Sequence, residues 1–148
     1  MSLFEKLSDD LRSAMKGGLK SRVEVLRFTL AGVQGAQKEK NFKQPGVALT
    51  DDEVVAVLQK EAKRRKEAIG LFRQGKRDDL VKKEEADLVV IYEYIPKELS
   101  AEEIEKIIDD LRSRGMNDFN MLMREAMKVM KGRADGKTVG DIIRKKIG

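Results

Sequence analysis

The sequence contains no cysteine, no histidine and no tryptophan. Without cysteine there are no disulfides, no thiolate nucleophiles and no zinc–sulfur sites. Without histidine the chain lacks the commonest general base and the commonest metal ligand. The acid pairs Glu84-Glu85 and Glu102-Glu103 are adjacent in sequence, so on a helix their side chains point about 100° apart. We therefore predict no catalytic residues, no metal and no cofactor.

Long apolar runs and aromatic residues are also scarce. No run approaches the roughly 18 residues of a membrane span. The first residues, MSLFEKLSDDL, contain no signal-peptide core. We expect a cytoplasmic protein with no membrane partner. Aromatic residues are only 5% of the chain, which argues against a platform of stacked single-stranded bases.

Charge is plentiful and unevenly distributed. The net charge of +5 divides into +6 for residues 1–76, −6 for residues 77–123 and +5 for residues 124–148. Two basic segments therefore flank an acidic one. This pattern fits an anionic partner, and it equally fits solvated segments of opposite sign that neutralise one another.

Apolar residues recur at helical spacing along most of the 148 residues, and no segment alternates as a strand would. We predict an all-α fold of about seven helices in two unlike subdomains. Capping boxes, in which a Ser or Thr side chain and a Glu three residues later satisfy each other's amides, mark three expected helix starts. They are Ser21 with Glu24, Thr50 with Glu53, and Ser100 with Glu103.

Pro96 is the expected boundary between the two subdomains. It follows an apolar helical segment that it cannot continue, because proline lacks the amide donor. The capping box at Ser100 comes almost at once afterwards. We predict a helical array over residues 1–95 and a three-helix subdomain over residues 96–148. The Met-rich stripe in residues 119–130 fits a core better than a plastic binding groove.

The segment Gly132-Arg-Ala-Asp-Gly136-Lys137-Thr138 superficially resembles a nucleotide-binding loop. A Walker A loop has four residues between its two glycines, whereas here there are three. Such a loop follows a strand of a parallel sheet, and this one follows an amphipathic helical pattern. We predict no nucleotide cofactor.

The same segment opens the last predicted helix, whose first amides carry a partial positive charge. Lysines and arginines surround it, and a solvated basic tail would have the same composition. We expect these cations to contact RNA phosphate, which confers affinity without reading sequence. The candidate RNA-binding residues are Lys131, Arg133, Lys137, Arg144 and Lys145, together with Lys63 and Arg64 from the third helix.

Several motifs resemble those of the YqeY family. They are Met130-Lys-Gly-Arg-Ala-Asp-Gly-Lys137 with Val139, Tyr94-Ile-Pro-Lys-Glu-Leu-Ser100, Lys60-Glu-Ala-Lys-Arg-Arg65, and Val25-Leu-Arg27 with Gln37-Lys-Glu39. The order matches and covers nearly the whole chain. The family is itself similar to the tail domain of the B subunit of the tRNA-dependent amidotransferase, which makes Gln-tRNA or Asn-tRNA. The resemblance implies an all-helical fold of two subdomains and a link to tRNA.

The resemblance also implies an association with carbon–nitrogen ligase activity that uses glutamine as amido donor. The chain is too short for both an ATP-using cradle and an amidase, so we expect no such activity from it alone. Our hypothesis is a non-catalytic helical module that binds tRNA or a tRNA–protein complex. An amidotransferase or an aminoacyl-tRNA synthetase is the expected protein partner. The alternative is a protein–protein interaction module without direct RNA contact.

Overall fold

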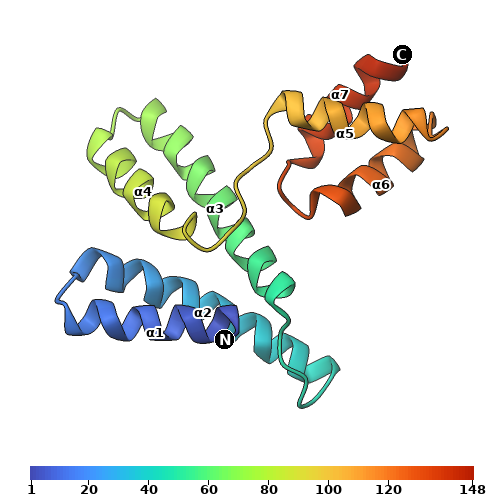
Figure 1. Cartoon of the computed structure of the whole chain (residues 1–148). Helices are drawn as coiled ribbons and strands as arrows, with labels where there is room; N and C mark the ends of the chain where they lie inside the picture. Colours follow the sequence, from blue (N-terminus) through green and yellow to red (C-terminus); the bar gives the residue numbers. More distant parts are fainter. The chain divides into compact units, whose positions relative to one another are not determined.

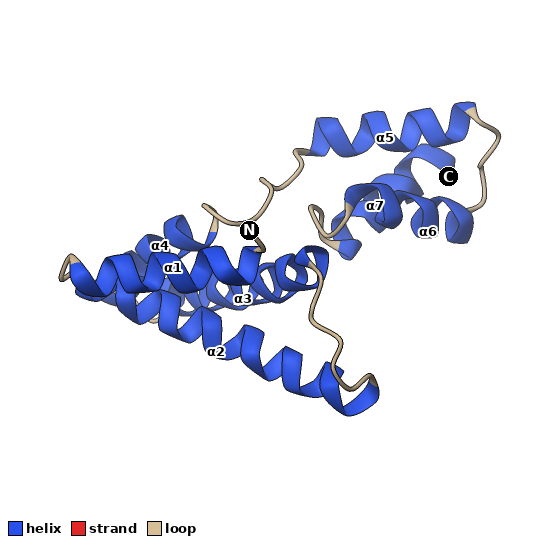
Figure 2. Cartoon of the chain, turned by 60° about the horizontal axis from the view of Figure 1, so that its bottom comes forward, coloured by secondary structure: helices blue, strands red, loops and turns tan.

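The computed structural model describes all residues from Met1 to Gly148. It contains seven α-helices and no strand (Figures 1 and 2), so the prediction of an all-α fold is confirmed. None of these helices is both long and apolar enough to cross a membrane. The helices are α1 (Leu3–Lys16), α2 (Lys20–Lys43), α3 (Asp51–Gln74), α4 (Asp78–Ile91), α5 (Ala101–Ser113), α6 (Phe119–Met130) and α7 (Gly136–Ile147).

The helices form two compact units. Unit 1 is Met1–Ile95 and contains α1 to α4, and unit 2 is Pro96–Gly148 and contains α5 to α7. Each unit has a separate cluster of buried apolar side chains. The two units are therefore described separately.

Unit 1 is built from two helical hairpins. Figure 1 shows α2 running back along α1 and extending past it to the loop that leads into α3. Helix α3 packs on α4, and α2 contacts both of them. Their shared core includes Leu7, Leu26, Leu58 and Ile91, each at most 1% exposed. This packing places one face of α2, α3 and α4 around a common groove.

Local capping by side chains explains two of the four helix starts in unit 1. The predicted capping box at Thr50 and Glu53 is present at the start of α3, and Ser2 with Glu5 forms another at the start of α1. The box predicted at Ser21 is wrong. Leu19 N donates to Ala14 O at 3.0 Å and closes the end of α1, so α2 begins at once with Leu19 as its N-cap and no side-chain cap.

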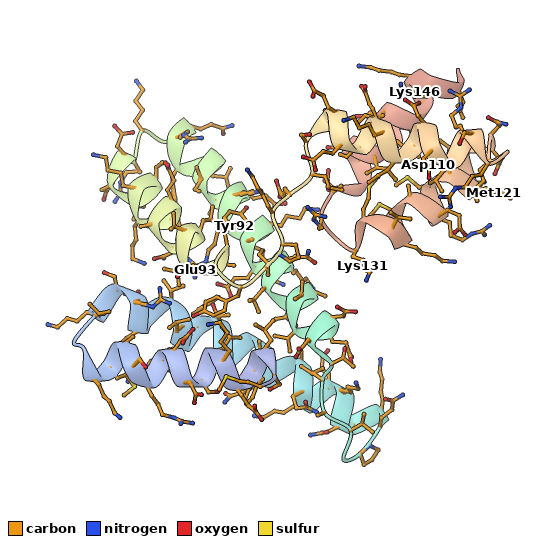
Figure 3. The ribbon with its side chains drawn as sticks, viewed as in Figure 1. Tyr92, Glu93, Asp110, Met121, Lys131 and Lys146 are labelled. Atoms are coloured by element: carbon orange, nitrogen blue, oxygen red, sulfur yellow. The ribbon has the colours of Figure 1, made fainter.

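The end of unit 1 is fastened to α1 and α2 by Tyr94. Its hydroxyl donates to Asp10 Oδ2 at 2.5 Å and accepts from Arg22 Nη2 at 3.2 Å. Arg22 also pairs with Glu93 at 2.7 Å. Figure 3 labels Glu93 beside Tyr92 in the turn that follows α4. Three segments distant in sequence are thus joined just before Pro96.

Unit 2 is a three-helix unit in which every helix contacts the other two. Its core includes Ile108, Leu122, Ala126, Val139 and Ile143, all fully buried. The Met-rich segment therefore contributes to a core, as predicted. Ser100 caps α5 by accepting from Glu103 N at 3.2 Å, and Asp118 caps α6 by accepting from Met121 N at 3.0 Å.

Candidate nucleic-acid interface

The turn between α6 and α7 begins with two left-handed residues. Lys131 is the C-cap of α6 with φ of 48°, and Gly132 follows with φ of 76°. Figure 3 shows Lys131 in this turn. Glycine is the usual residue at such a position, because a side chain there clashes with the backbone. The turn therefore carries a lysine where helix capping alone favours glycine.

Arg133 holds this turn against the segment that precedes α5. Its Nε donates to Lys97 O at 2.9 Å, and its own carbonyl accepts from Leu99 N at 2.9 Å. The side chain is half-buried. Arg133 was predicted as an RNA-binding residue, and the structure gives it an anchoring contact within unit 2.

Helix α7 presents a mainly cationic face to solvent. Asp135 is the N-cap residue, although its side chain makes no capping hydrogen bond. Residues 137, 141, 144 and 145 lie within about 100° of one another around the helix axis, and all four are exposed. Arg144 pairs with Asp141 at 3.2 Å and lies 4.9 Å from the Phe119 ring centroid. Lys137 and Lys145 therefore share this face with Asp141, whose charge is already paired with that of Arg144.

The other two candidates lie in unit 1. Lys63 and Arg64 are exposed neighbours on α3. The structure thus groups five of the seven candidates within the last turn and helix of unit 2, and places these two in unit 1. Of this pair, Arg64 lines the groove described next.

A groove of about 660 Å³ lies between α2, α3 and α4, and we call it the unit 1 groove. The residues that line it follow helical spacing on each helix, so one face of each contributes. They are Glu24, Val25, Arg27 and Phe28 from α2, Glu61, Arg64, Arg65 and Ala68 from α3, and Lys83, Glu84 and Asp87 from α4.

Arg65 forms ion pairs with three carboxylates in this groove. Its Nε lies 3.1 Å from Glu61 Oε2, and its Nη1 lies 3.0 Å from both Glu84 Oε2 and Asp87 Oδ2. Thr29 Oγ1 donates to Glu61 Oε2 at 3.1 Å, and Lys83 Nζ lies 3.3 Å from Asp87 Oδ2. The network joins α2, α3 and α4.

Burial changes the pKa of Glu61, one of the acids of this network. Desolvation is the largest influence on Glu61 and raises its pKa above the ordinary 4.5, although the hydrogen bonds from Arg65 and Thr29 oppose it. Charged groups leave water only at a large free-energy cost unless they are paired. Arg65 therefore links α3 to α4, and removing it would leave the buried Glu61 without a counter-ion, whereas Asp87 would keep Lys83.

The sequence hypothesis missed Arg65 and its partners. A signal was available, because Glu61 and Arg65 interrupt the apolar stripe of Val54, Leu58 and Ile69 at helical spacing. A charged pair four residues apart inside such a stripe indicates a buried ion pair. Glu84 and Asp87 come from a different helix, and no local pattern links them to Arg65.

Two other arginines of the groove differ from Arg65. Arg27 and Arg64 are both exposed and line the groove, yet neither forms an ion pair with a carboxylate. Phe28 is 61% exposed, and the Arg65 Cζ atom lies 5.3 Å from its ring centroid. The groove thus combines unpaired cations, an exposed aromatic ring and a carboxylate-rich floor.

Comparison with known proteins gives matches along nearly the whole chain. The family model described as Yqey-like protein matches residues 4–147. A relative with similar coverage is the altered inheritance of mitochondria protein 41, mitochondrial, of Pyrenophora tritici-repentis. It is 30% identical over 152 residues, which cover 99% of this chain and 81% of that protein.

Shorter matches extend the similarity. An uncharacterised protein of Schizosaccharomyces pombe is 33% identical over 90 residues, which cover 61% of this chain and 69% of that protein. The E subunit of the glutamyl-tRNA(Gln) amidotransferase of Thermococcus gammatolerans is 42% identical over 57 residues. That match covers 33% of this chain but only 9% of the much longer archaeal protein.

Proposed function

The chain belongs to the YqeY-like family, and on that premise we propose that it is a non-catalytic helical module that binds tRNA or a tRNA-bound complex. The resemblance to a small part of a glutamyl-tRNA(Gln) amidotransferase supports the tRNA link. An amidotransferase or an aminoacyl-tRNA synthetase is the protein partner that fits this link. We place the protein in the cytoplasm, with the mitochondrial relative indicating the other compartment to test.

One observation carries the proposal, namely the cationic turn and helix face of unit 2. Lys131 occupies a left-handed position, and Lys137 and Lys145 are exposed on the helix that follows. Such cations neutralise phosphates and release counterions, which provides affinity for any RNA backbone. The proposal therefore predicts strong salt dependence and little dependence on RNA sequence.

The test is a titration of labelled tRNA at several salt concentrations. The variant combines Lys131→Ala, Lys137→Ala and Lys145→Ala, and it keeps Arg133 because that side chain anchors the Lys97 carbonyl. We expect weaker binding to all tRNAs and a salt slope reduced by up to about 0.9 per lost contact, the duplex-DNA value.

A matched control removes the same charge elsewhere in unit 2, with Lys106→Ala, Arg114→Ala and Arg124→Ala. These three side chains are exposed on or beside α5 and α6. The proposal requires the control to bind tRNA more tightly than the test variant. An equal loss of tRNA affinity in both variants would show that binding depends only on the net charge of the protein. No binding by the unmodified protein at low salt would favour the protein–protein interaction module.

A further inference from the structure

Helix α2 carries an exposed apolar stripe along its outer side. Phe28 is 61% exposed and Phe42 is 92% exposed, and Ala31 and Gly35 between them are exposed as well. At about 100° per residue, these four residues lie within roughly 60° of one another around the helix axis. They lie on the side opposite the buried residues of the helix. We call them the α2 stripe, and exposed apolar surface of this kind marks interaction sites.

The rest of unit 1 leaves this stripe open. Helix α2 has 24 residues and α1 has 14, so α2 extends past α1 (Figure 1). A Cβ atom added at Gly35 would meet no atom of another element within 4 Å. The Arg65 guanidinium lies over one face of the Phe28 ring, with Cζ 5.3 Å from the ring centroid, and the ring is still 61% exposed. The opposite face of Phe28 is therefore free for an aromatic neighbour.

The spacing of the stripe makes it complementary to itself. Phe28, Gly35 and Phe42 are seven residues apart, the repeat that keeps one side of a helix against a partner helix. The order large, small, large is the same from either end. A second copy that runs antiparallel about a two-fold axis at Gly35 therefore places its Phe42 opposite Phe28 and its Gly35 opposite Gly35. Such an isologous contact forms the Phe28–Phe42 pair twice and is closed.

The residues between the phenylalanines also favour a second copy as the partner. The same register places Gly32 opposite Lys38 of the second copy and Ala31 opposite Glu39, so long side chains lie over small ones. The methylene stems of the charged residues cover the small residues while their charges stay in water. A parallel pair would instead set Lys38 against Lys38 and Glu39 against Glu39, and like charges so placed are unfavourable. The charges therefore favour the antiparallel order.

We propose that the α2 stripe pairs two copies of the chain in a weak antiparallel dimer. Each Phe28 packs its open ring face against Phe42 of the second copy, and the two helices cross at Gly35. At about 200 Å² per phenylalanine, the exposed fractions correspond to roughly 600 Å² of ring surface over the two copies. Stable complexes bury about 1,200–2,000 Å², so we expect a dissociation constant on the order of 10–100 μM. This inference is independent of RNA binding.

The first measurement is sedimentation equilibrium of the full chain over a concentration series that brackets this dissociation constant. The mean mass should rise from 16.8 kDa toward twice that value. Phe42→Ala should weaken dimerisation at least about tenfold, because the dimer loses two aromatic pairs, whereas Phe42→Tyr should keep the dimer. Phe42 is 92% exposed in the single chain, so its removal leaves the core intact, and circular dichroism verifies the helix content.

A charge at the crossing point provides a second variant. Gly35→Glu places two carboxylates beside the two-fold axis and should abolish dimerisation, since like charges then face each other. The matched control is Gly70→Glu on α3, because Gly70 is also an exposed helical glycine with open space around it. The control should dimerise like the unmodified chain.

A single cysteine at the crossing tests the register, since the chain has no cysteine of its own. Packed helix axes lie about 8–10 Å apart and Cα atoms lie about 2.3 Å from each axis. Two residues at position 35 are therefore within reach of a disulfide. With oxidised glutathione as the oxidant, Gly35→Cys should form a covalent dimer much faster than the control Gly70→Cys.

Three results would overturn the inference. They are a monomer at every concentration, equal cross-linking of the two cysteine variants, or a dimer that Phe42→Ala and Gly35→Glu leave unchanged. A monomer whose tRNA affinity falls on Phe42→Ala would make the stripe an RNA contact instead. The unit 2 triple variant, which removes Lys131, Lys137 and Lys145, should dimerise like the unmodified chain. A dimer that binds no tRNA would contradict the proposed function and leave this inference standing.

Discussion

At the scale of single residues, Tyr94 shows how a motif residue acts through hydrogen bonds. Its hydroxyl lies between Asp10 and Arg22, which belong to two other helices. Burial and the bond to Asp10 raise the pKa of Tyr94 well above the ordinary 10.0. The hydroxyl therefore remains a neutral donor at physiological pH. The bond from Tyr94 in turn is the largest cause that holds the pKa of Asp10 below 3.8.

We predict that Tyr94→Phe lowers the free energy of unfolding by about 1–2 kcal/mol at neutral pH, because a hydrogen bond to a charged group is lost. Because the pKa of Asp10 is lower in the folded state, this carboxylate stabilises the fold at pH values above its ordinary pKa. That stabilisation disappears as the pH falls through the pKa of Asp10 in the folded state. The difference between the two proteins should therefore shrink below about pH 3.8. Urea denaturation over a series of acid pH values measures it.

Tyr92→Phe is the matched control for this prediction. The Tyr92 hydroxyl is buried and has no hydrogen-bond partner, so its removal should leave stability unchanged or raise it slightly. If Tyr92→Phe and Tyr94→Phe destabilise equally, the anchoring role of Tyr94 is wrong.

At the scale of elements, the turn between α6 and α7 allows the effect of Lys131 on helix capping to be measured apart from its effect on RNA binding. Lys131 and Lys76 are the two residues other than glycine with positive φ, 48° and 56°. Each lies just after a helix, at a place where glycine avoids a penalty of roughly 1–2 kcal/mol. For Lys131 the proposed contact with RNA phosphate gives a reason for the charge, whereas no such contact is proposed for Lys76.

We predict that Lys131→Gly keeps or raises the melting temperature while it weakens tRNA binding. Glycine relieves the steric strain at positive φ in the folded state, and this offsets its greater entropy in the unfolded chain. The net change in the free energy of unfolding therefore stays within about 1 kcal/mol. The salt slope of tRNA binding should fall by up to about 0.9. Thermal denaturation and a tRNA titration of the same sample provide the two measurements.

Lys76→Gly provides the comparison, since it changes the same residue type at the same kind of backbone position in unit 1. It should match Lys131→Gly in stability and bind tRNA like the unmodified protein. Equal tRNA losses in both glycine variants would count against a specific contact at Lys131.

The sequence predicted the helices, but it did not predict contacts between residues far apart in the chain. Thr50 and Ser100 act as caps because capping depends on a few adjacent residues. The box at Ser21 failed because the end of α1 runs directly into α2, and the sequence pattern alone does not show how few residues a turn needs. Arg133 remains a candidate RNA contact, and the sequence did not show its bond to the Lys97 carbonyl because the two residues lie 36 positions apart. The Arg65 network was missed for the same reason, since tertiary packing creates it.

At the scale of the whole molecule, the separate cores of the two units have an energetic consequence. Leu58 lies in the core of unit 1 and Leu122 in that of unit 2, and both are fully buried. Tyr94 bonds within unit 1, and Lys97 bonds within unit 2. Only Ile95 and Pro96 lie between these two anchored residues. We expect the units to behave as separate domains.

We predict that Leu122→Ala costs about 2–5 kcal/mol and removes amide protection from α5, α6 and α7, while α1 to α4 stay protected. A unit of 53 residues has little stability to lose. Hydrogen exchange followed by mass spectrometry locates the loss. Leu58→Ala should produce the opposite distribution. Equal loss of protection across the whole chain in both variants would show one cooperative domain.

The positions of Tyr92 and Tyr94 also determine which part of the molecule optical spectroscopy follows. The chain has two tyrosines and no tryptophan, and both tyrosines belong to unit 1. Unit 2 has Phe119 as its sole aromatic residue. Intrinsic fluorescence and absorbance near the tyrosine band therefore follow unit 1 alone, whereas the ellipticity of the peptide bond follows all seven helices. If the melting curve from ellipticity differs from the one from tyrosine fluorescence, the difference reports the unfolding of unit 2, which the tyrosines do not detect.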